Sequence, residues 1–403
     1  MKRLILAVLF STGAQAAHPE GEYIARVADC MACHTAPGGD PMAGGKKFAT
    51  PLGNIYSTNI TPDKTHGIGG YSYEAFARAV REGIAKDGHP LYPAMPYPAY
   101  ARLSDRDLHA LYDYFMQDVT PSARPNRESD IPWLLSARWP LHIWNALFID
   151  DPAPASSDMA DPGRAARIAR GAYLVEGPGH CGACHTPRGV AMQEKGFTHK
   201  DEAFLSGAMI DGWYAPSLRD SRLSAQEMTS MLLTGKSQHD ALSGSMAEVV
   251  SESTQYLTQQ DAAAISDYLQ SLRTSHQPSP QVARRQSDDS ASGEGKVLFG
   301  RYCATCHGDS GKGSDFSVPS LVNNPVVMAD EPGPLIRIIA DGAQTPAIRG
   351  QVSFGMPAYG EVMKDEEMRD LVNYVRQRWG QTDAPVSASD VADSKKEARD
   401  AGH

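Results

Sequence analysis

All six cysteines of this chain stand in one repeated pattern, Cys-x-x-Cys-His. The pattern occurs at "DCMACHT" (29–35), "HCGACHT" (180–186) and "YCATCHG" (302–308). Cysteines at this spacing lie one helical turn apart and reach the two vinyl groups of one porphyrin, while the next imidazole binds its iron. The pattern therefore predicts three covalently bound haems c. Their attachment residues are Cys30 and Cys33, Cys181 and Cys184, and Cys303 and Cys306, and the iron-binding histidines are His34, His185 and His307.

Two other interpretations of a Cys-x-x-Cys pair are weaker. A structural zinc site needs four ligands at one place, and each pair here has only its own histidine close by in the sequence. A redox dithiol does not need the histidine, and certainly not three times.

A methionine on the other side of each iron would close the haem and raise its reduction potential. Met95 and Met246 each lie 61 residues after the histidine of their motif, and Met356 lies 49 residues after His307. Each precedes a repeated helical segment by 7–11 residues, so these three are the expected axial ligands. Methionine is also common core filler. The alternatives are Met209, Met228, Met231, Met328 and, for bis-histidine ligation, His89 and His239.

The repeated segments predict a mainly α-helical chain of three tandem cytochrome c-type domains, each built around one covalent haem. "LSDRDLHALYDYF" (103–115), "LTQQDAAAISDYL" (257–269) and "MKDEEMRDLVNYV" (363–375) align without a gap and share a helical apolar face. A second shared helix starts near Gly21, Gly171 and Gly295, where a small residue allows a close helix crossing. The expected boundaries are domain 1 at 17–150, a linker at 151–165, domain 2 at 166–274, a linker at 275–294 and domain 3 at 295–380.

The two ends of the chain have distinct compositions. Residues 1–16 have a basic start, a short apolar core and a small-residue cleavage site, as an export signal does. Haem attachment takes place outside the bacterial cytoplasmic membrane, so export to the periplasm is expected. No run has the length of a membrane-spanning helix. The tail at 381–403 is polar, and disorder is expected there.

Charge disfavours nucleic acid as a partner. Of 38 Lys and Arg residues, Lys2 and Arg3 belong to the expected signal, which leaves 36 against 48 acidic residues. The haem propionates add further negative charge. Local charge still allows steering toward a protein partner.

Beyond the haem motifs, several stretches resemble the three-haem cytochrome c subunits of bacterial membrane-associated dehydrogenases. The stretches are "TPLGNIYSTNITPDKTHGIGGYSYEAFARAVREGI" (50–84), "YPAMPYPAY" (92–100), "CGACHTPRG" (181–189), "DGWYAPSL" (211–218) and "FGMPAYG" (354–360). The resemblance covers about residues 20–380 and implies that Met95, Met246 and Met356 are the axial ligands. It also implies a separate dehydrogenase subunit as electron donor, and ubiquinone or a terminal oxidase as acceptor. Some members have an apolar C-terminal anchor, which this tail lacks.

The apolar stretch "IPWLLSARWPLHIWNALF" (131–148) has two interpretations. It packs between the first two domains, or it touches lipid, quinone or a partner. Four residues after the motifs are candidates for binding haem propionates, with ordinary packing as the alternative: Tyr56, Trp213, Tyr214 and Arg188. The carbonyl of Pro319 is expected to accept the Nδ1 proton of His307.

The sequence as a whole indicates an electron-transfer subunit without an active site of its own. The favoured donor is a flavin-dependent sugar or sugar-acid dehydrogenase, followed by a quinoprotein (PQQ) or molybdenum enzyme. Peripheral attachment to the outer face of the membrane is compatible with the sequence. The alternatives are a free periplasmic shuttle and, less favoured, a catalytic haem enzyme such as a peroxidase, which needs an open iron.

Overall fold

The computed structural model describes residues 18–50, 52–132, 136–149, 163–210, 212–273, 293–380 and 384–400. The expected export signal, Trp133 and most of the two expected linkers lie outside the described residues. As expected, the described chain is mainly helical, and its strands form two-stranded antiparallel hairpins.

Three stretches of the chain, which we call the first, second and third repeat, each contain one Cys-x-x-Cys-His motif. The first repeat contains α1 (Pro19–Val27), α2 (Cys30–His34), β1 (Lys47–Thr50), β2 (Gly53–Tyr56), α3 (Tyr73–Glu82), α4 (Tyr97–Tyr100), α5 (Asp105–Gln117) and α6 (Pro140–Phe148). The second contains α7 (Arg164–Glu176), α8 (Gly182–His185), β3 (Ala208–Ile210), β4 (Trp213–Ala215), α9 (Ala225–Thr234), α10 (Gly244–Glu252), a 3₁₀ turn (Thr254–Tyr256) and α11 (Gln259–Ser271). The third contains α12 (Glu294–Tyr302), α13 (Ala304–His307), α14 (Pro325–Met328), α15 (Gly333–Asp341), β5 (Ala343–Gln344), β6 (Gly355–Met356), α16 (Asp365–Val375), a π-helical turn (Arg376–Gly380) and α17 (Ala388–Asp400).

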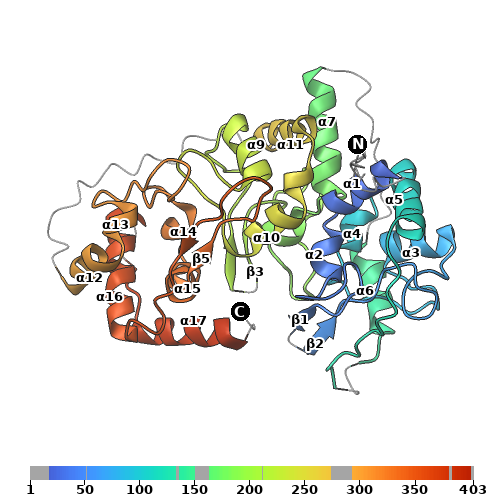
Figure 1. Cartoon of the computed structure of the whole chain (residues 1–403), viewed down its shortest axis with the longest axis horizontal. Coiled ribbons are helices and arrows are strands. Elements are labelled where there is room, and N and C mark those ends of the chain that lie inside the picture. Colours follow the sequence, from blue (N-terminus) through green and yellow to red (C-terminus); the bar gives the residue numbers. More distant parts are fainter. Residues whose placement is uncertain are drawn as a thin grey trace, which may run out of the picture.

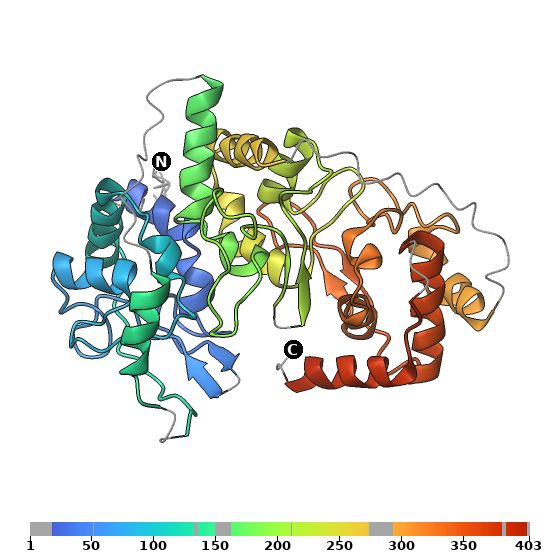
Figure 2. The same ribbon diagram turned by 180° about the vertical axis from the view of Figure 1, so that it is seen from behind.

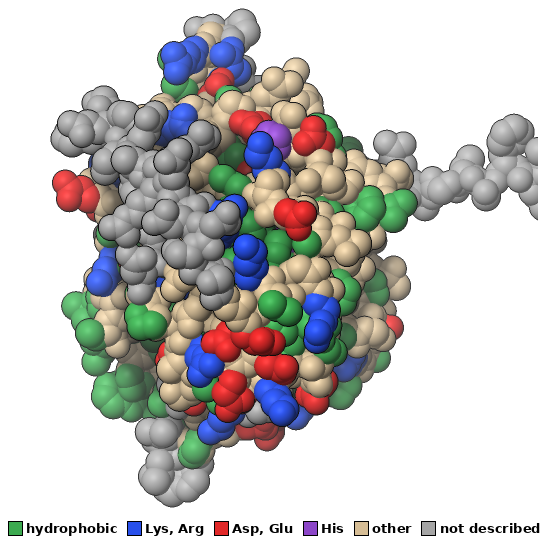
Figure 3. Space-filling view, turned by 90° about the vertical axis from the view of Figure 1, so that its left-hand side faces the viewer, with side chains coloured by type: hydrophobic (Ala, Val, Ile, Leu, Met, Phe, Trp, Pro, Cys, Tyr) green, Lys and Arg blue, Asp and Glu red, His purple; other side chains and the backbone are tan. Residues whose placement is uncertain are grey.

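The repeats follow one another along the long axis of the molecule. Figure 1 shows the first repeat at one end, the second in the middle and the third at the other end, and the view from behind in Figure 2 shows the same order. The end formed by the third repeat carries acidic and basic side chains close together along its lower part (Figure 3).

A glycine brings together the first and the last haem-flanking helix of every repeat. A Cβ atom on Gly21 would lie 2.0 Å from the carbonyl oxygen of Ala110, and one on Gly171 would lie 2.1 Å from that of Ala264. The equivalent distance from Gly295 to the oxygen of Asp370 is 2.2 Å. No side chain fits at such distances, so the close crossing expected from the sequence is present three times.

Each repeat has its own cluster of buried apolar side chains, and the predicted apolar faces of α5, α11 and α16 point into these clusters. Burial of these faces is the main source of stability for short helices. The buried face residues are Leu108, Leu111 and Phe115 in the first repeat, Ala262, Ile265 and Leu269 in the second, and Met368, Leu371, Val372 and Val375 in the third.

The last haem-flanking helix begins with a side-chain cap in two repeats and without one in the third. Ser104 accepts a hydrogen bond from the Asp107 N–H at 3.1 Å, and Thr258 accepts one from the Asp261 N–H at 3.1 Å. In the third repeat Lys364 occupies the N-cap position, and Asp365 is the first residue of α16. Its carboxylate accepts from Lys395 Nζ at 2.7 Å.

Disorder was expected for the whole polar tail, but residues 388–400 form the helix α17. Val391 is fully buried, and Val386 just before α17 is also buried, both in the core of the third repeat. α17 packs against α15 and α16. Two buried valines in a polar segment, together with the Lys395–Asp365 contact, attach the helix, and average composition does not reveal such single positions.

The apolar stretch before the second repeat is packed on one side and exposed on the other. Trp144 donates through Nε1 to the Ala191 carbonyl at 2.9 Å, and Asn145 accepts from the Tyr97 hydroxyl at 2.8 Å, so one side of α6 packs between the first two repeats. The other side exposes Trp139 (67%), Ile143 (53%) and Leu147 (69%). At a spacing of four residues these three side chains lie in one row.

Candidate haem-attachment sites

The three Cys-x-x-Cys-His motifs adopt the same short helical structure. In the second motif the His185 N–H donates to the Cys181 carbonyl at 3.0 Å, and in the third the His307 N–H donates to Cys303 at 2.9 Å. The first motif is the helix α2. The two cysteines of each pair therefore lie one turn apart, and none of the six forms a disulfide.

Each motif histidine has a backbone carbonyl as the partner of its Nδ1 atom. The distances are 2.7 Å from His34 to Thr58, 2.8 Å from His185 to Pro216 and 3.2 Å from His307 to Pro319. The expected contact to Pro319 is confirmed, and the other two follow the same design. A carbonyl oxygen only accepts hydrogen bonds, so Nδ1 carries the proton and the Nε2 lone pair is free to bind a metal.

Burial keeps these groups neutral. It lowers the pKa of His34, His185 and His307, although each Nδ1 contact to a backbone carbonyl acts in the opposite direction. Burial also raises the pKa of Cys30, Cys33 and Cys181 to about 12 and that of Cys303 to about 11. A redox dithiol instead depends on a lowered thiol pKa, so this environment argues against that interpretation.

The comparisons with known proteins agree with this geometry. Residues 291–375 match the family model described as cytochrome c oxidase, cbb3-type, subunit III. The chain is 46% identical over 401 residues to the gluconate 2-dehydrogenase cytochrome c subunit of Pantoea cypripedii, covering 94% of this chain and 89% of the relative. It is 44% identical over 389 residues to the cytochrome c subunit of the quinone alcohol dehydrogenase of Gluconobacter oxydans strain 621H, covering 92% and 80%. It is 37% identical over 403 residues to the fructose dehydrogenase cytochrome subunit of Gluconobacter japonicus, covering 92% and 81%.

The chain belongs to the family of dehydrogenase cytochrome c subunits. It is therefore an electron-transfer subunit of a dehydrogenase complex, binds haem c covalently and is not the catalytic enzyme itself. Among the described residues, no helix is both long enough and apolar enough to cross a membrane.

Two of the three expected methionine ligands of this cytochrome subunit pack against the same core as a motif cysteine. Met95 and Cys30 pack against the same core in the first repeat, and Met356 and Cys303 do so in the third. Met246 lies on α10, which contacts both α9 of its own repeat and α2 of the first. Its assignment to the second haem therefore depends more on sequence position than the other two assignments do.

The structure separates these methionines from some of their competitors. Met228 and Met231 are buried side chains, and Met228 is part of the second core. Met209 is exposed on β3. The two histidine alternatives are not separated in this way, because His89 contacts Asp87 and His239 lies 3.7 Å from Asp315 through Nδ1, which leaves Nε2 of both available.

The candidates for propionate binding differ in what else they contact. Trp213, on β4 after the second motif, has a buried Nε1–H with no hydrogen-bond partner among the described residues. A haem carboxylate would satisfy this donor. Tyr56 already donates to Asp130 at 2.7 Å, and Arg188 donates to the carbonyls of Ala183 and Met192. Trp213 is therefore a better candidate for donating a hydrogen bond to a haem propionate than Tyr56 or Arg188.

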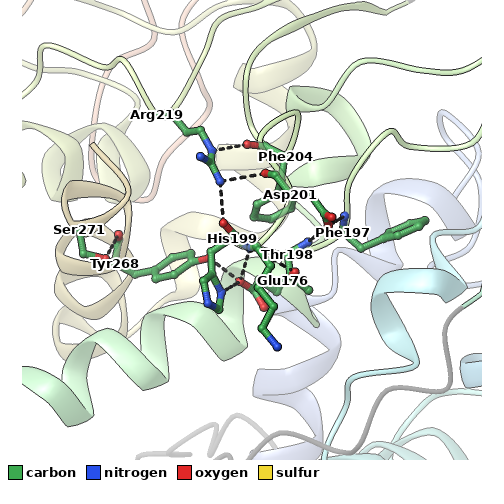
Figure 4. A network of polar contacts seen from close by, with 10 residues as sticks. Glu176, Phe197, Thr198, His199, Asp201, Phe204, Arg219, Tyr268 and Ser271 are labelled. Carbon is green, nitrogen blue, oxygen red and sulfur yellow. Dashed lines mark hydrogen bonds and ion pairs between the residues drawn. The ribbon is translucent and has the colours of Figure 1, made fainter. Parts of the chain in front are cut away.

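A polar network fixes the loop that follows the second motif (Figure 4). Glu176 accepts hydrogen bonds from the Tyr268 hydroxyl at 2.5 Å and from the backbone N–H of His199 at 3.0 Å. Arg219 donates to the carbonyls of Phe204, His199 and Asp201 at 2.6–3.0 Å. The next turn of this loop brings the Gly207 N–H to the His185 carbonyl at 2.8 Å. Sequence reasoning missed this network because Glu176 and Tyr268 are 92 positions apart and the partners of Arg219 are backbone carbonyls.

Proposed function

We propose that the chain carries three haems c and conducts electrons from a dehydrogenase subunit to ubiquinone or a terminal oxidase. The observation that carries this proposal is the threefold occurrence of one local structure. Each time, a cysteine pair one turn apart precedes a histidine whose Nδ1 faces a carbonyl and whose Nε2 is free. The bound haem iron would supply the one-electron chemistry.

The proposed axial pairs are His34 with Met95, His185 with Met246, and His307 with Met356. The matching sequence positions and the packing of Met95 and Met356 against the cores that hold Cys30 and Cys303 support them. Thioether ligation closes the iron and favours electron transfer over binding of small molecules. For this reason a peroxidase activity is less favoured.

The proposed donor is a flavin-dependent sugar or sugar-acid dehydrogenase. The gluconate and fructose dehydrogenase relatives support this choice. The quinone alcohol dehydrogenase relatives, of similar identity, make a quinoprotein the second choice. A molybdenum enzyme is the third.

We place the mature subunit in the periplasm, exported through residues 1–16, with peripheral attachment to the outer face of the cytoplasmic membrane. The exposed row Trp139, Ile143 and Leu147 supports the attachment. Apolar side chains of this kind insert into the interface of a bilayer.

The test is affinity purification of the tagged mature chain from detergent-treated membranes of its native host, with haem content measured on the same sample. We expect three haems per chain and a stoichiometric large subunit whose cofactor identifies the dehydrogenase class. A chain that elutes alone from the soluble periplasmic fraction would favour the free shuttle. Fewer than three haems would contradict the proposed site residues.

A further inference from the structure

Two tyrosines make reciprocal contacts between the first and second repeats. The Tyr23 hydroxyl, on α1, donates to Asp261 Oδ2 on α11 at 2.5 Å. The Tyr173 hydroxyl, on α7, donates to Asp107 Oδ2 on α5 at 2.5 Å. Each tyrosine lies two residues after the crossing glycine of its own repeat, so the two occupy equivalent positions. The same contact is therefore made in both directions.

The backbone takes part in the same contacts. The Tyr23 hydroxyl accepts from the N–H of Thr258 at 3.4 Å, and the Tyr173 hydroxyl accepts from the N–H of Ser104 at 3.2 Å. These two residues are the N-caps of α11 and α5. Each tyrosine thus binds the start of the other repeat's last haem-flanking helix. The arrangement relates the two repeats by an approximate twofold rotation.

One arginine lies between the two contacts. Arg170 donates to Asp261 through Nε at 2.9 Å and through Nη2 at 2.8 Å. Its guanidinium lies 5.4 Å from the centre of the Tyr173 ring and interacts electrostatically with Asp107. Burial raises the pKa of both tyrosines far above its ordinary value, so both hydroxyls keep their protons as donors. Charge-assisted hydrogen bonds of this kind are stronger than neutral ones.

The same interface brings the first two haem motifs together. The Tyr100 hydroxyl donates to the carbonyl of Ala28, two residues before the first cysteine of the first motif, at 2.6 Å. The ring of Tyr100 packs edge-on against His180, directly before the second motif, at 5.6 Å between centroids. The Ser253 hydroxyl of the second repeat donates to the Val27 carbonyl of α1 at 3.3 Å.

The third repeat lacks this tyrosine–aspartate contact. Val297 occupies the position of the tyrosines and is 54% exposed. Glu367 occupies the position of the aspartates and accepts from the Lys364 N–H of its own repeat at 2.9 Å. The third repeat joins the second through other contacts, among them the Ser320 N–H with the His239 carbonyl at 2.7 Å and the guanidinium of Arg337 on α15 over the Trp213 ring on β4 at 4.6 Å.

We propose that Tyr23 and Tyr173 are positioning residues whose reciprocal hydrogen bonds hold the first two haem motifs in one mutual orientation. The two haems then form a rigid electron-transfer pair, and the third haem belongs to a separately held unit. The inference rests on the proposed haem content. In the transfer step one electron leaves a ferrous iron and reduces a ferric iron, with no bond made or broken. Its rate therefore depends on the geometry that the protein holds.

The experiment uses the full haem-loaded chain with Tyr23→Phe, Tyr173→Phe and both together. Neighbouring haems in a fixed orientation give a bisignate couplet in Soret circular dichroism. We expect each single variant to weaken the couplet and the double variant to lose it, with Soret absorption and haem content unchanged. Hydrogen exchange of α5 and α11 near their N-caps should accelerate about tenfold, as the loss of one charge-assisted hydrogen bond implies.

Tyr268→Phe is the matched control, because it removes a buried hydroxyl that donates to a carboxylate within the second repeat (Figure 4). It should leave the couplet intact. An unchanged couplet in the double variant, or an equal loss in the control, would overturn the proposal. A three-haem wild-type chain without a couplet would overturn it too. A chain without haem would contradict the proposed function but not the tyrosine contacts, because hydrogen exchange tests those contacts whether or not haem is bound. Unchanged hydrogen exchange in the double variant would overturn the tyrosine contacts.

Discussion

At each motif a single backbone carbonyl determines which form of histidine faces the haem. The carbonyls of Thr58, Pro216 and Pro319 hold the three Nδ1 protons in place. This leaves Nε2 as a lone-pair donor before any iron is bound. A preset tautomer and ring orientation are what a metal-binding histidine needs.

The axial role of Met356 is testable by substitution. Met356→Ala should open the third haem, lower its potential by on the order of 0.1 V and allow carbon monoxide to bind. The measurement is a redox titration followed by carbon monoxide difference spectroscopy. Met209→Ala, at an exposed position, should change neither. An unchanged titration with no ligand binding in Met356→Ala would refute the assignment.

Asp29 gives the stability a defined pH dependence. Burial, and then the charge of Glu248, raises the pKa of this carboxyl to about 8. Between about pH 4 and 8 the folded state therefore holds a proton that the unfolded chain releases, and the free energy of unfolding falls as pH rises.

Asp29→Asn should remove this dependence. Asparagine tolerates the left-handed backbone of residue 29, where φ is 53°. Urea unfolding should show variant and wild type close to equal at pH 4, and the variant more stable by at least about 1 kcal/mol at pH 8. Parallel pH profiles for the two proteins would show that the carboxyl is not buried as described.

At the scale of elements, the helix crossings hold each repeat closed around its motif. The three crossings are alike, because each glycine faces a backbone carbonyl oxygen and the Cβ atom of a recurring tyrosine, Tyr114, Tyr268 or Tyr374. The absence of a Cβ on the glycine is what allows both atoms to approach.

Two glycines on α12 should respond to alanine in opposite ways. Gly295→Ala places a methyl group 2.2 Å from the Asp370 oxygen and should destabilise the protein by about 1–3 kcal/mol. Gly300→Ala meets nothing within 4 Å and should stabilise it by up to about 1 kcal/mol through helix propensity. Thermal unfolding of both variants checks the two signs. A harmless Gly295→Ala would mean that α12 and α16 do not cross closely.

The attachment of α17 depends on its one fully buried valine. Val391→Ala should lower the free energy of unfolding by about 1–3 kcal/mol and raise protease cleavage after residue 380. Val352→Ala, at an exposed position, should change stability by less than about 0.5 kcal/mol. Equal effects of the two substitutions would show that Val391 does not attach α17, and would support the disorder expected from the composition of the tail.

At the scale of the whole molecule, the three repeats are not equivalent. The first two face each other through Tyr23, Tyr173 and Arg170, whereas the third contacts the second without equivalent tyrosine–aspartate hydrogen bonds. The exposed side of α6 carries an apolar row formed by Trp139, Ile143 and Leu147. In the chain as a whole, acidic residues outnumber basic ones. Such a row on an otherwise charged surface indicates a binding face.

Membrane attachment through α6 can be measured on vesicles. Replacing Trp139, Ile143 and Leu147 together by serine should reduce binding to phosphatidylethanolamine–phosphatidylglycerol vesicles at least about tenfold, since each side chain loses its apolar burial. Val352→Ser is the control for an exposed apolar residue elsewhere. A wild-type chain that does not bind these vesicles would exclude membrane attachment through α6.

The chemistry of the chain could be predicted from the sequence because it depends on local spacing. Cysteines three residues apart, a following histidine and helical periodicity are set by a few consecutive residues. The helical class, the apolar faces of α5, α11 and α16, and the close glycine crossings followed for the same reason. The contact of His307 with Pro319 was also within reach, because only twelve residues separate them.

What only the tertiary structure decided involves residues far apart in the chain. Tyr23 and Asp261 are 238 positions apart, and neither stands in a Cys-x-x-Cys-His motif. The helix α17 depends on Val391 reaching the third core, and the exposed side of α6 depends on which of its faces the neighbouring repeats cover. Local spacing sets what a haem motif can bind. The orientation of one motif toward another depends on packing between repeats, which no short stretch of sequence encodes.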